Sequence, residues 1–234
     1  MKKNEQDMSF LDHLEILRWH LIRSGIAILI LSILAFIFKE IIFDAILLAP
    51  KDPNFLTYRF LCNISQGLGL GDALCIKESP FSLMNINMAG QFSTHLMTSI
   101  YAGFILAFPY VFWEIWRFIL PALKEKETKV TRGVVFFSSL LFLTGVTFGY
   151  YVIAPLSINF LGSYQVSQTV ANQISLTSFV STVTTISLAN GIIFELPILV
   201  YFLTKIGLLT PEFMRTYRRH AMVITLILSA IITH

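Results

Sequence analysis

The strongest constraint on this chain is a series of apolar stretches, each about as long as a helix that crosses a lipid bilayer. The hydrocarbon core of a bilayer is about 30 Å thick, so a spanning helix needs about 20 mostly apolar residues. Hydrophobic residues make up 55% of the 234-residue chain and charged residues only 13%, about half the charged fraction of roughly 25% in soluble proteins. The sequence therefore predicts an all-α integral membrane protein, a polytopic helical bundle that forms a single membrane domain over residues 1–234. The expected spans lie at about residues 21–38, 92–112, 134–153, 182–204 and 220–232.

The basic residues indicate how these spans are oriented. Lys and Arg are concentrated before the first span, between the second and third spans, and between the fourth and fifth. In contrast, the connection 39–91 balances its few basic residues with acidic ones, and the connection 157–175 has no charge. Because basic loops stay on the cytoplasmic side, we expect a multi-pass protein of the bacterial inner membrane, with a cytoplasmic N-terminus and these two connections outside. The first span lacks a small-residue cleavage site, which predicts a retained helix rather than a signal peptide.

One glutamate, Glu195, stands inside an expected span. It is the only charged residue of Thr182–Thr204, and an ionisable side chain at that depth costs at least roughly 2.5–3.5 kcal/mol, so a functional role is the default expectation. Pro197 lacks an N–H and leaves the carbonyl of Ile193 without its helical partner. Two roles are open for Glu195: a docking point for a polar side chain on a partner's single helix, or a protonated carboxyl group that only hydrogen-bonds a neighbouring helix.

Two cytoplasmic segments carry the chemistry expected of a binding surface. Residues 10–23 form an amphipathic helix that enters the first span, and Glu114–Arg132 combines Trp and Phe rings with alternating charges. Carboxylates at Glu15 and Glu127, beside apolar side chains, suit a ligand that presents guanidinium groups next to an apolar stretch, because Arg–carboxylate bonds are bidentate. The alternative for the second segment is an ordinary solvated loop.

Other classes of function find less support in the sequence. His13 and His20 fall on nearly the same helical face, but no third ligand lies near them, so no metal or other cofactor is predicted. No Lys/Arg run with interleaved aromatic residues suggests nucleic-acid binding. His95 and Glu195 have no nucleophile or base beside them in sequence, so we do not expect an enzyme. A proton-coupled small-solute transporter that uses Glu195 is the main alternative, although no second interrupted, charged span pairs with it.

Cys62 and Cys75 share the outside connection 39–91. If that side is the periplasm, a disulfide is chemically permitted and would add on the order of 3 kcal/mol by constraining the loop. Two free thiols are the alternative, and the sequence leaves both open.

Short motifs along nearly the whole chain resemble the TatC family, the large multispanning subunit of the twin-arginine protein translocase. In family order they are His-Leu-x-x-Leu-Arg at 13–18, Pro50, Phe-Pro at 108–109, Trp-x-Phe-Ile-x-Pro-Ala-Leu at 116–123, Glu127, Phe148 with Tyr150, Pro155 with Leu156, and Phe-Glu-x-Pro at 194–197. Each motif is short, but their combination at these spacings is specific.

The resemblance implies a six-helix, cup-like protein that binds the twin-arginine signal peptides of folded export substrates and nucleates an export complex driven by the proton-motive force. Implied partners are single-span Tat subunits, further copies of the chain and membrane lipid. On matching positions, the resemblance implies a partner-subunit site at Glu195 and Pro197. It also implies a signal-peptide surface formed by Phe118, Leu123 and Glu127 together with His13, Glu15 and Arg18.

The chain departs from the family pattern in two places. The family motif His-Leu-x-Glu-Leu-Arg has a glutamate where this chain has Ile16, and Glu15 stands one residue earlier, about 100° round the helix. Either Glu15 takes over the role or the site depends on Glu127 alone. The family also has a sixth span after the fifth, whereas this sequence ends at His234, so we expect a truncated chain.

Overall fold

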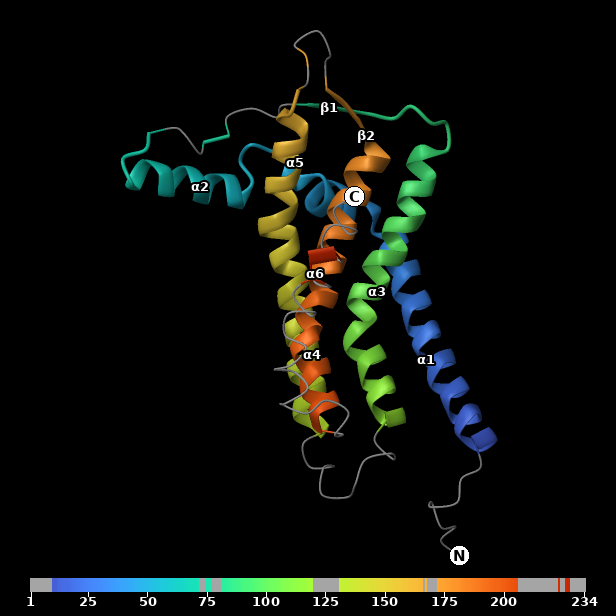
Figure 1. The fold of residues 1–234 in the computed structure, drawn as a ribbon. Coiled ribbons are helices and arrows are strands. Elements are labelled where there is room, and N and C mark those ends of the chain that lie inside the picture. Colours follow the sequence, from blue (N-terminus) through green and yellow to red (C-terminus); the bar gives the residue numbers. More distant parts are fainter. Residues whose placement is uncertain are drawn as a thin grey trace, which may run out of the picture.

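A computed structural model describes residues 10–71, 75–76, 81–119, 131–165, 167, 172–205, 223 and 226–227, without the side chains of residues 10–13, 131–132 and 205. Within this part of the chain, four helical segments are long and apolar enough to cross a membrane, and they stand side by side (Figure 1). They are Leu14–Ile37, Gly90–Ile119, Gly133–Ser163 and Leu176–Thr204. The predicted class, an all-α integral membrane protein, is confirmed. The expected span at 220–232 lies almost entirely outside the described residues.

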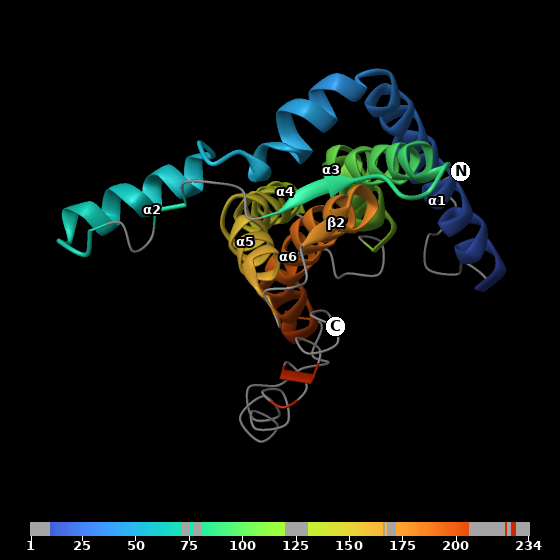
Figure 2. The same cartoon turned by 90° about the horizontal axis from the view of Figure 1, so that it is seen from above.

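The first half of the described chain rises through the bundle, turns across it and descends. The elements in order are α1 (Phe10–Ile37), the π-helix η2 (Ile41–Leu47), the 3₁₀-helix η3 (Ala49–Lys51), α2 (Leu56–Gly67), β1 (Ser82–Met84) and α3 (Gly90–Ile119). α2 lies across the direction of the spans and extends away from them (Figures 1 and 2).

The second half rises and descends once more. Its elements are α4 (Thr131–Phe148), the π-helical turn η6 (Gly149–Ile153), α5 (Ala154–Ser163), β2 (Gln173–Ser175) and α6 (Leu176–Lys205). α4, η6 and α5 follow one another without a break and form one long rod. We call the end of the bundle where α1 begins and α3 ends the N-terminal end, and the opposite end, which carries α2, α5 and the strands, the cap end.

The spans approach one another closely at small and polar residues, while many of their large apolar side chains face outward. A Cβ atom on Gly103 of α3 would lie 2.6 Å from the backbone N of Ser32, so α1 and α3 approach too closely for any side chain at this position. Leu29 and Phe136, in contrast, are more than half exposed. Lipid tails are as apolar as Leu, so membrane helices associate through small residues rather than large ones. Other buried small polar residues of the spans are Ser24, Thr98, Ser99, Ser138 and Ser187.

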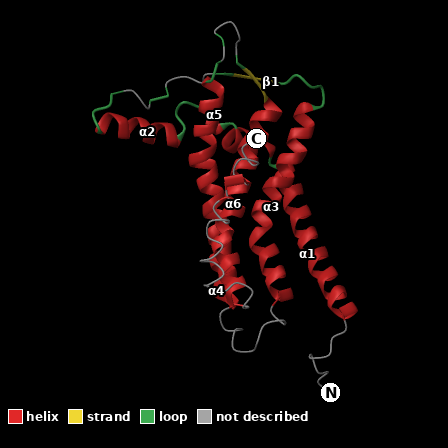
Figure 3. Cartoon of the chain, in the orientation of Figure 1, coloured by secondary structure: helices red, strands yellow, loops and turns green. Residues whose placement is uncertain are grey.

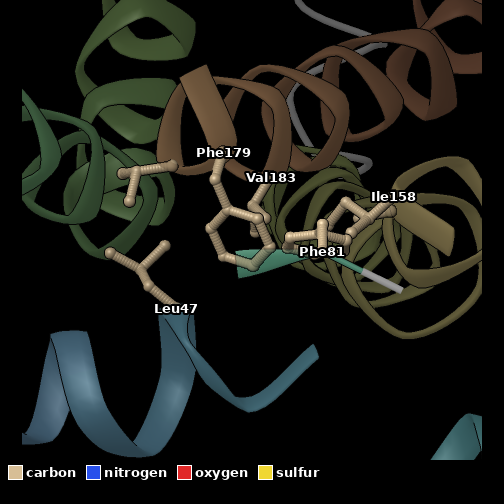
Figure 4. Packing of buried hydrophobic residues seen from close by; sticks show 7 residues of the cluster. Leu47, Phe81, Ile158, Phe179 and Val183 are labelled. Carbon is tan, nitrogen blue, oxygen red and sulfur yellow. The ribbon is translucent and has the colours of Figure 1, made fainter. Parts of the chain in front are cut away.

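A compact apolar core closes the cap end. Leu47, Phe81, Ile158, Phe179 and Val183 pack together there (Figure 4). They come from η2, the segment before β1, α5 and α6, so this core fixes the connections to the spans. β1 and β2 pair in parallel across it (Figure 3). The sequence did not indicate these strands, because three residues are too few to show an alternating pattern.

The long cap-end connection is cross-linked. Cys62 of α2 and Cys75 form a disulfide with their Cα atoms 4.4 Å apart. The bond closes the segment that follows α2 back onto that helix.

Candidate functional site

A buried carboxylate, Glu114, joins α1 to α3 at the N-terminal end of the bundle. Glu114 is only 1% exposed. Its Oε2 atom pairs with Nδ1 of His20 on α1, and its Oε1 atom accepts a hydrogen bond of 3.0 Å from the hydroxyl of Tyr110. The guanidinium of Arg117 lies 3.9 Å from the same oxygen. Polar partners therefore surround this carboxylate, as a buried charge requires.

Aromatic rings surround this ion pair. The ring of Phe118 meets His20 edge-on, with 6.2 Å between ring centroids. The guanidinium carbon of Arg117 lies 4.8 Å above the ring of Trp113, within the range of a cation–π contact. Trp116 is buried against Phe202 of α6 at 5.2 Å. The ends of α1, α3 and α6 are thereby held together.

The structure describes only part of the signal-peptide surface expected from the sequence. Phe118 lies beside His20, as above. Glu15 and Arg18 are exposed on α1, within about a turn and a half of His20. Leu123, Glu127 and the side chain of His13 lie outside the described residues.

The helix geometry distinguishes Ile16 from Glu15. Ile16 stands one turn before His20, and residues four apart share a helix face. Because His20 contacts Glu114 of α3, Ile16 lies on the face of α1 that is turned toward α3. Glu15 is rotated from that face by about 100°, and both side chains are exposed.

Sequence reasoning missed Glu114 as a functional residue. It was considered only as the first residue of a charged, aromatic segment. The signal was nevertheless present, because Glu114 stands between Trp113 and Ile115 in an otherwise apolar run, as Glu195 does in its own span. The sequence does not indicate which residue pairs with Glu114, because its partner, His20, lies 94 positions away.

A second polar site lies within the membrane-spanning part of the bundle, between α4 and α6. The hydroxyl of Ser138, which is fully buried on α4, donates a hydrogen bond of 2.5 Å to Oε2 of Glu195. The Oε1 atom of Glu195 is buried and makes no hydrogen bond of acceptable geometry within the described part of the chain. The backbone N–H of Phe142 faces the same carboxyl group. Glu195 thus has a hydrogen bond to a neighbouring helix and one further acceptor oxygen.

The backbone around this site is tightly packed. A Cβ atom on Gly145 of α4 would lie 2.7 Å from the carbonyl oxygen of Asn190 on α6, so the two helices are in close contact one turn from Glu195. α6 continues as a helix through Pro197, which is exposed. The carboxyl group therefore faces α4, while the proline lies on the outer side of the helix.

Comparisons with known proteins give one consistent result. The family model for Sec-independent protein translocase protein (TatC) matches residues 12–234. The chain is 38% identical to the Sec-independent protein translocase protein TatC of Blattabacterium sp. subsp. Periplaneta americana (strain BPLAN) over 234 residues, which cover 100% of this chain and 88% of the relative. It is 34% identical to the TatC protein of Aquifex aeolicus (strain VF5), over 96% of this chain and 84% of that protein.

The solved structures agree with the sequence relatives. A crystal structure of the twin arginine translocase receptor TatC matches with a TM-score of 0.73 and 32% sequence identity. The match covers 95% of this chain and 87% of that chain.

Proposed function

Since this chain belongs to the TatC family of Sec-independent protein translocase proteins, we propose that it recognises twin-arginine signal peptides of folded proteins and nucleates the export complex. Recognition takes place on the cytoplasmic face of the bacterial inner membrane. The N-terminal end of the bundle is the cytoplasmic end in this proposal, because the basic connections lie there.

The contact between His20 and Glu114 carries the proposal. It joins two segments that are 94 positions apart in the chain, so that the first turns of α1 and the end of α3 form one surface. Glu15 and Phe118 lie on this surface, and the segment with Leu123 and Glu127 follows directly after α3. Carboxylates next to aromatic and apolar side chains match a ligand with two guanidinium groups beside an apolar stretch.

The intramembrane site supports a second part of the proposal, the assembly with partners. Single-span Tat subunits dock a polar side chain against Glu195, beside the Pro197 turn of α6, and further copies of the chain join the same complex. The Oε1 atom of Glu195 is the acceptor for this contact, because Oε2 already accepts from Ser138.

The small-solute transporter is not favoured. Two acidic residues of the described spans lie against neighbouring helices: the buried Glu114, which is ion-paired at the N-terminal end, and the half-buried Glu195, which is hydrogen-bonded to Ser138. Neither pairs with a second interrupted helix of the kind that forms transporter sites. A role as a translocase component also requires no catalytic group of the chain.

Binding of a twin-arginine signal peptide to the protein in native membranes tests the proposal. Glu127→Ala removes a charge-assisted contact worth roughly 1.5–3 kcal/mol, so affinity should fall by about ten- to a hundredfold, while Glu127→Asp should retain part of it. Glu125→Ala is the matched control, since it removes a carboxylate from the same charged segment. Binding that survives Glu127→Ala unchanged refutes the assignment of Glu127.

A further inference from the structure

We propose that α2 is an interfacial helix that inserts the side chains of Leu56, Phe60 and Ile64 among membrane phospholipids at the cap end of the bundle. The proposal concerns how the cap is held on the membrane, and it does not depend on which peptide the opposite end binds. Its argument rests on the depth of α2, the direction of its faces and what covers each face.

The depth of α2 coincides with the edge of the hydrocarbon core. Phe55, directly before α2, stacks on the ring of Tyr151 with 5.6 Å between centroids, and Thr57 donates a hydrogen bond to the carbonyl of Tyr151. Tyr151 follows shortly after α4, whose 18 residues rise about 27 Å. Arg132 is the last charged residue before the uncharged sequence 133–194, so a core about 30 Å thick that begins directly after it ends near Tyr151. Tyrosine is also a residue type enriched at that level.

Two neighbouring hydroxyl groups show which face of α2 is turned toward the membrane. The hydroxyl of Tyr58 lies 3.0 Å from the carbonyl oxygen of Pro155 and 2.9 Å from that of Pro50, so that its single proton is shared between the two acceptors. Burial raises the pKa of Tyr58 to about 12, so the phenol remains a donor. Thr57 bonds the carbonyl of Tyr151, which lies one turn, about 6 Å, nearer the N-terminal end of the same rod than Pro155 does. The Thr57 side of α2 therefore faces the membrane core.

The apolar residues of α2 share that side. At 100° per residue, Leu56, Phe60 and Ile64 all fall within about 100° of Thr57. Their side chains are 67%, 62% and 37% exposed in the isolated chain. The polar residues Arg59 and Gln66, which are also exposed, lie on the other side of the helix.

The face of α2 that carries Tyr58, Cys62 and Ser65 is already covered by the chain itself. Ser65 is fully buried there, and its hydroxyl donates to the carbonyl of Gly71 at 2.7 Å. The disulfide between Cys62 and Cys75 holds the returning segment over the same face, and in Figure 1 residues 68–71 and 75–76 pass above α2. The apolar face, in contrast, stays largely uncovered by the described part of the chain.

Phospholipid is the occupant that the arrangement favours. α2 extends away from the four spans (Figure 2), at the level where lipid surrounds the bundle. Its open face presents large exposed apolar side chains, as the spans do with Leu29 and Phe136. A helix with an apolar face toward the acyl chains and a polar face toward water lies stably in the interface.

Photo-crosslinking in native membranes tests this proposal on the full chain. p-Benzoylphenylalanine is incorporated at Phe60, where it preserves an aromatic ring, and in separate variants at Gln66 and at Leu29. Leu29 of α1 gives the yield for a lipid-facing position, and Gln66, which is exposed on the polar face of α2, is the matched control. After illumination, mass spectrometry of the protein identifies the adduct.

We expect a phospholipid adduct at Phe60 with a yield comparable to that at Leu29, and a much lower lipid yield at Gln66. A polypeptide adduct at Phe60, from a second copy of the chain or from another protein, would overturn the proposal. Equal lipid yields at Phe60 and Gln66 would also contradict it, as would a lipid adduct at Leu29 with none at Phe60.

Discussion

Removing His20 should destabilise the bundle through Glu114 rather than through lost packing alone. In His20→Ala the carboxylate of Glu114, 1% exposed, loses its His20 partner but keeps the hydroxyl of Tyr110 at 3.0 Å and the guanidinium of Arg117 at 3.9 Å. Leaving a buried charge wholly unpaired costs about 3–5 kcal/mol, whereas single interhelical polar contacts in membranes reach at most about 1.7 kcal/mol. Because Glu114 keeps two partners in His20→Ala, we expect the free energy of unfolding of this variant to fall by about 1–2 kcal/mol.

A double-mutant cycle in a denaturing-detergent titration measures this effect. Glu114→Gln removes the charge and keeps the shape, so His20→Ala should cost less in that background, with a coupling energy of about 1 kcal/mol. His95→Ala is the matched control, because His95 also joins α3 to α1, by stacking on Phe36 with 4.0 Å between centroids, but forms no ion pair with a carboxylate of the described residues. His95→Ala should lower the free energy of unfolding by the same amount in the wild-type protein and in the Glu114→Gln variant. Additive losses for His20 and Glu114 would refute the reasoning.

Three further outcomes follow from the same geometry. Glu195→Gln should retain the co-purified partner subunit, whereas Glu195→Ala should weaken the binding of that subunit by about 1–2 kcal/mol. If Glu195→Ala and the wild-type protein co-purify the subunit equally while export is lost, Glu195 is a proton relay instead. Ile16→Glu should strengthen signal-peptide binding, since position 16 shares the α3-facing side of α1, and an unchanged affinity would mean that the position is idle. Gly103→Ala should lower stability by about 1–3 kcal/mol through overpacking, whereas Gly25→Ala, where a Cβ meets nothing within 4 Å, should have little effect.

The sequence was most informative where the lipid dictates the pattern. Long apolar runs have few structural alternatives in a chain with so few charges, because only helices or closed barrels satisfy the backbone inside a bilayer. The all-α membrane class was therefore predicted correctly. The family was also predicted correctly, but from the combination of short motifs along the chain. The sequence indicates less clearly that α4, η6 and α5 continue as one rod through Pro155, since a proline usually ends a helix. Pro155 lies in the first turn of α5, where its missing N–H costs little.

The remaining features depend on contacts between distant residues. The pairing of β1 with β2 and the burial of Phe81 against Phe179 join segments about 90 residues or more apart, which no local pattern records. The same holds for Glu114. Its burial follows from the close approach of α1 and α3 at Gly103, and that approach is a property of two helices rather than of either sequence alone.

Crosslinking from the surface at the N-terminal end to a signal peptide tests the central claim most directly. With p-benzoylphenylalanine at Phe118, a peptide with the Arg-Arg pair should give an adduct in native membranes, and the same peptide with Lys-Lys should give little, because lysine cannot form the bidentate contact. The same photoreactive residue at Tyr164, which is 64% exposed near the cap end, should give none. Equal adducts for the Arg-Arg and Lys-Lys peptides, or an adduct at Tyr164 in place of Phe118, would contradict recognition of the twin-arginine motif at this surface.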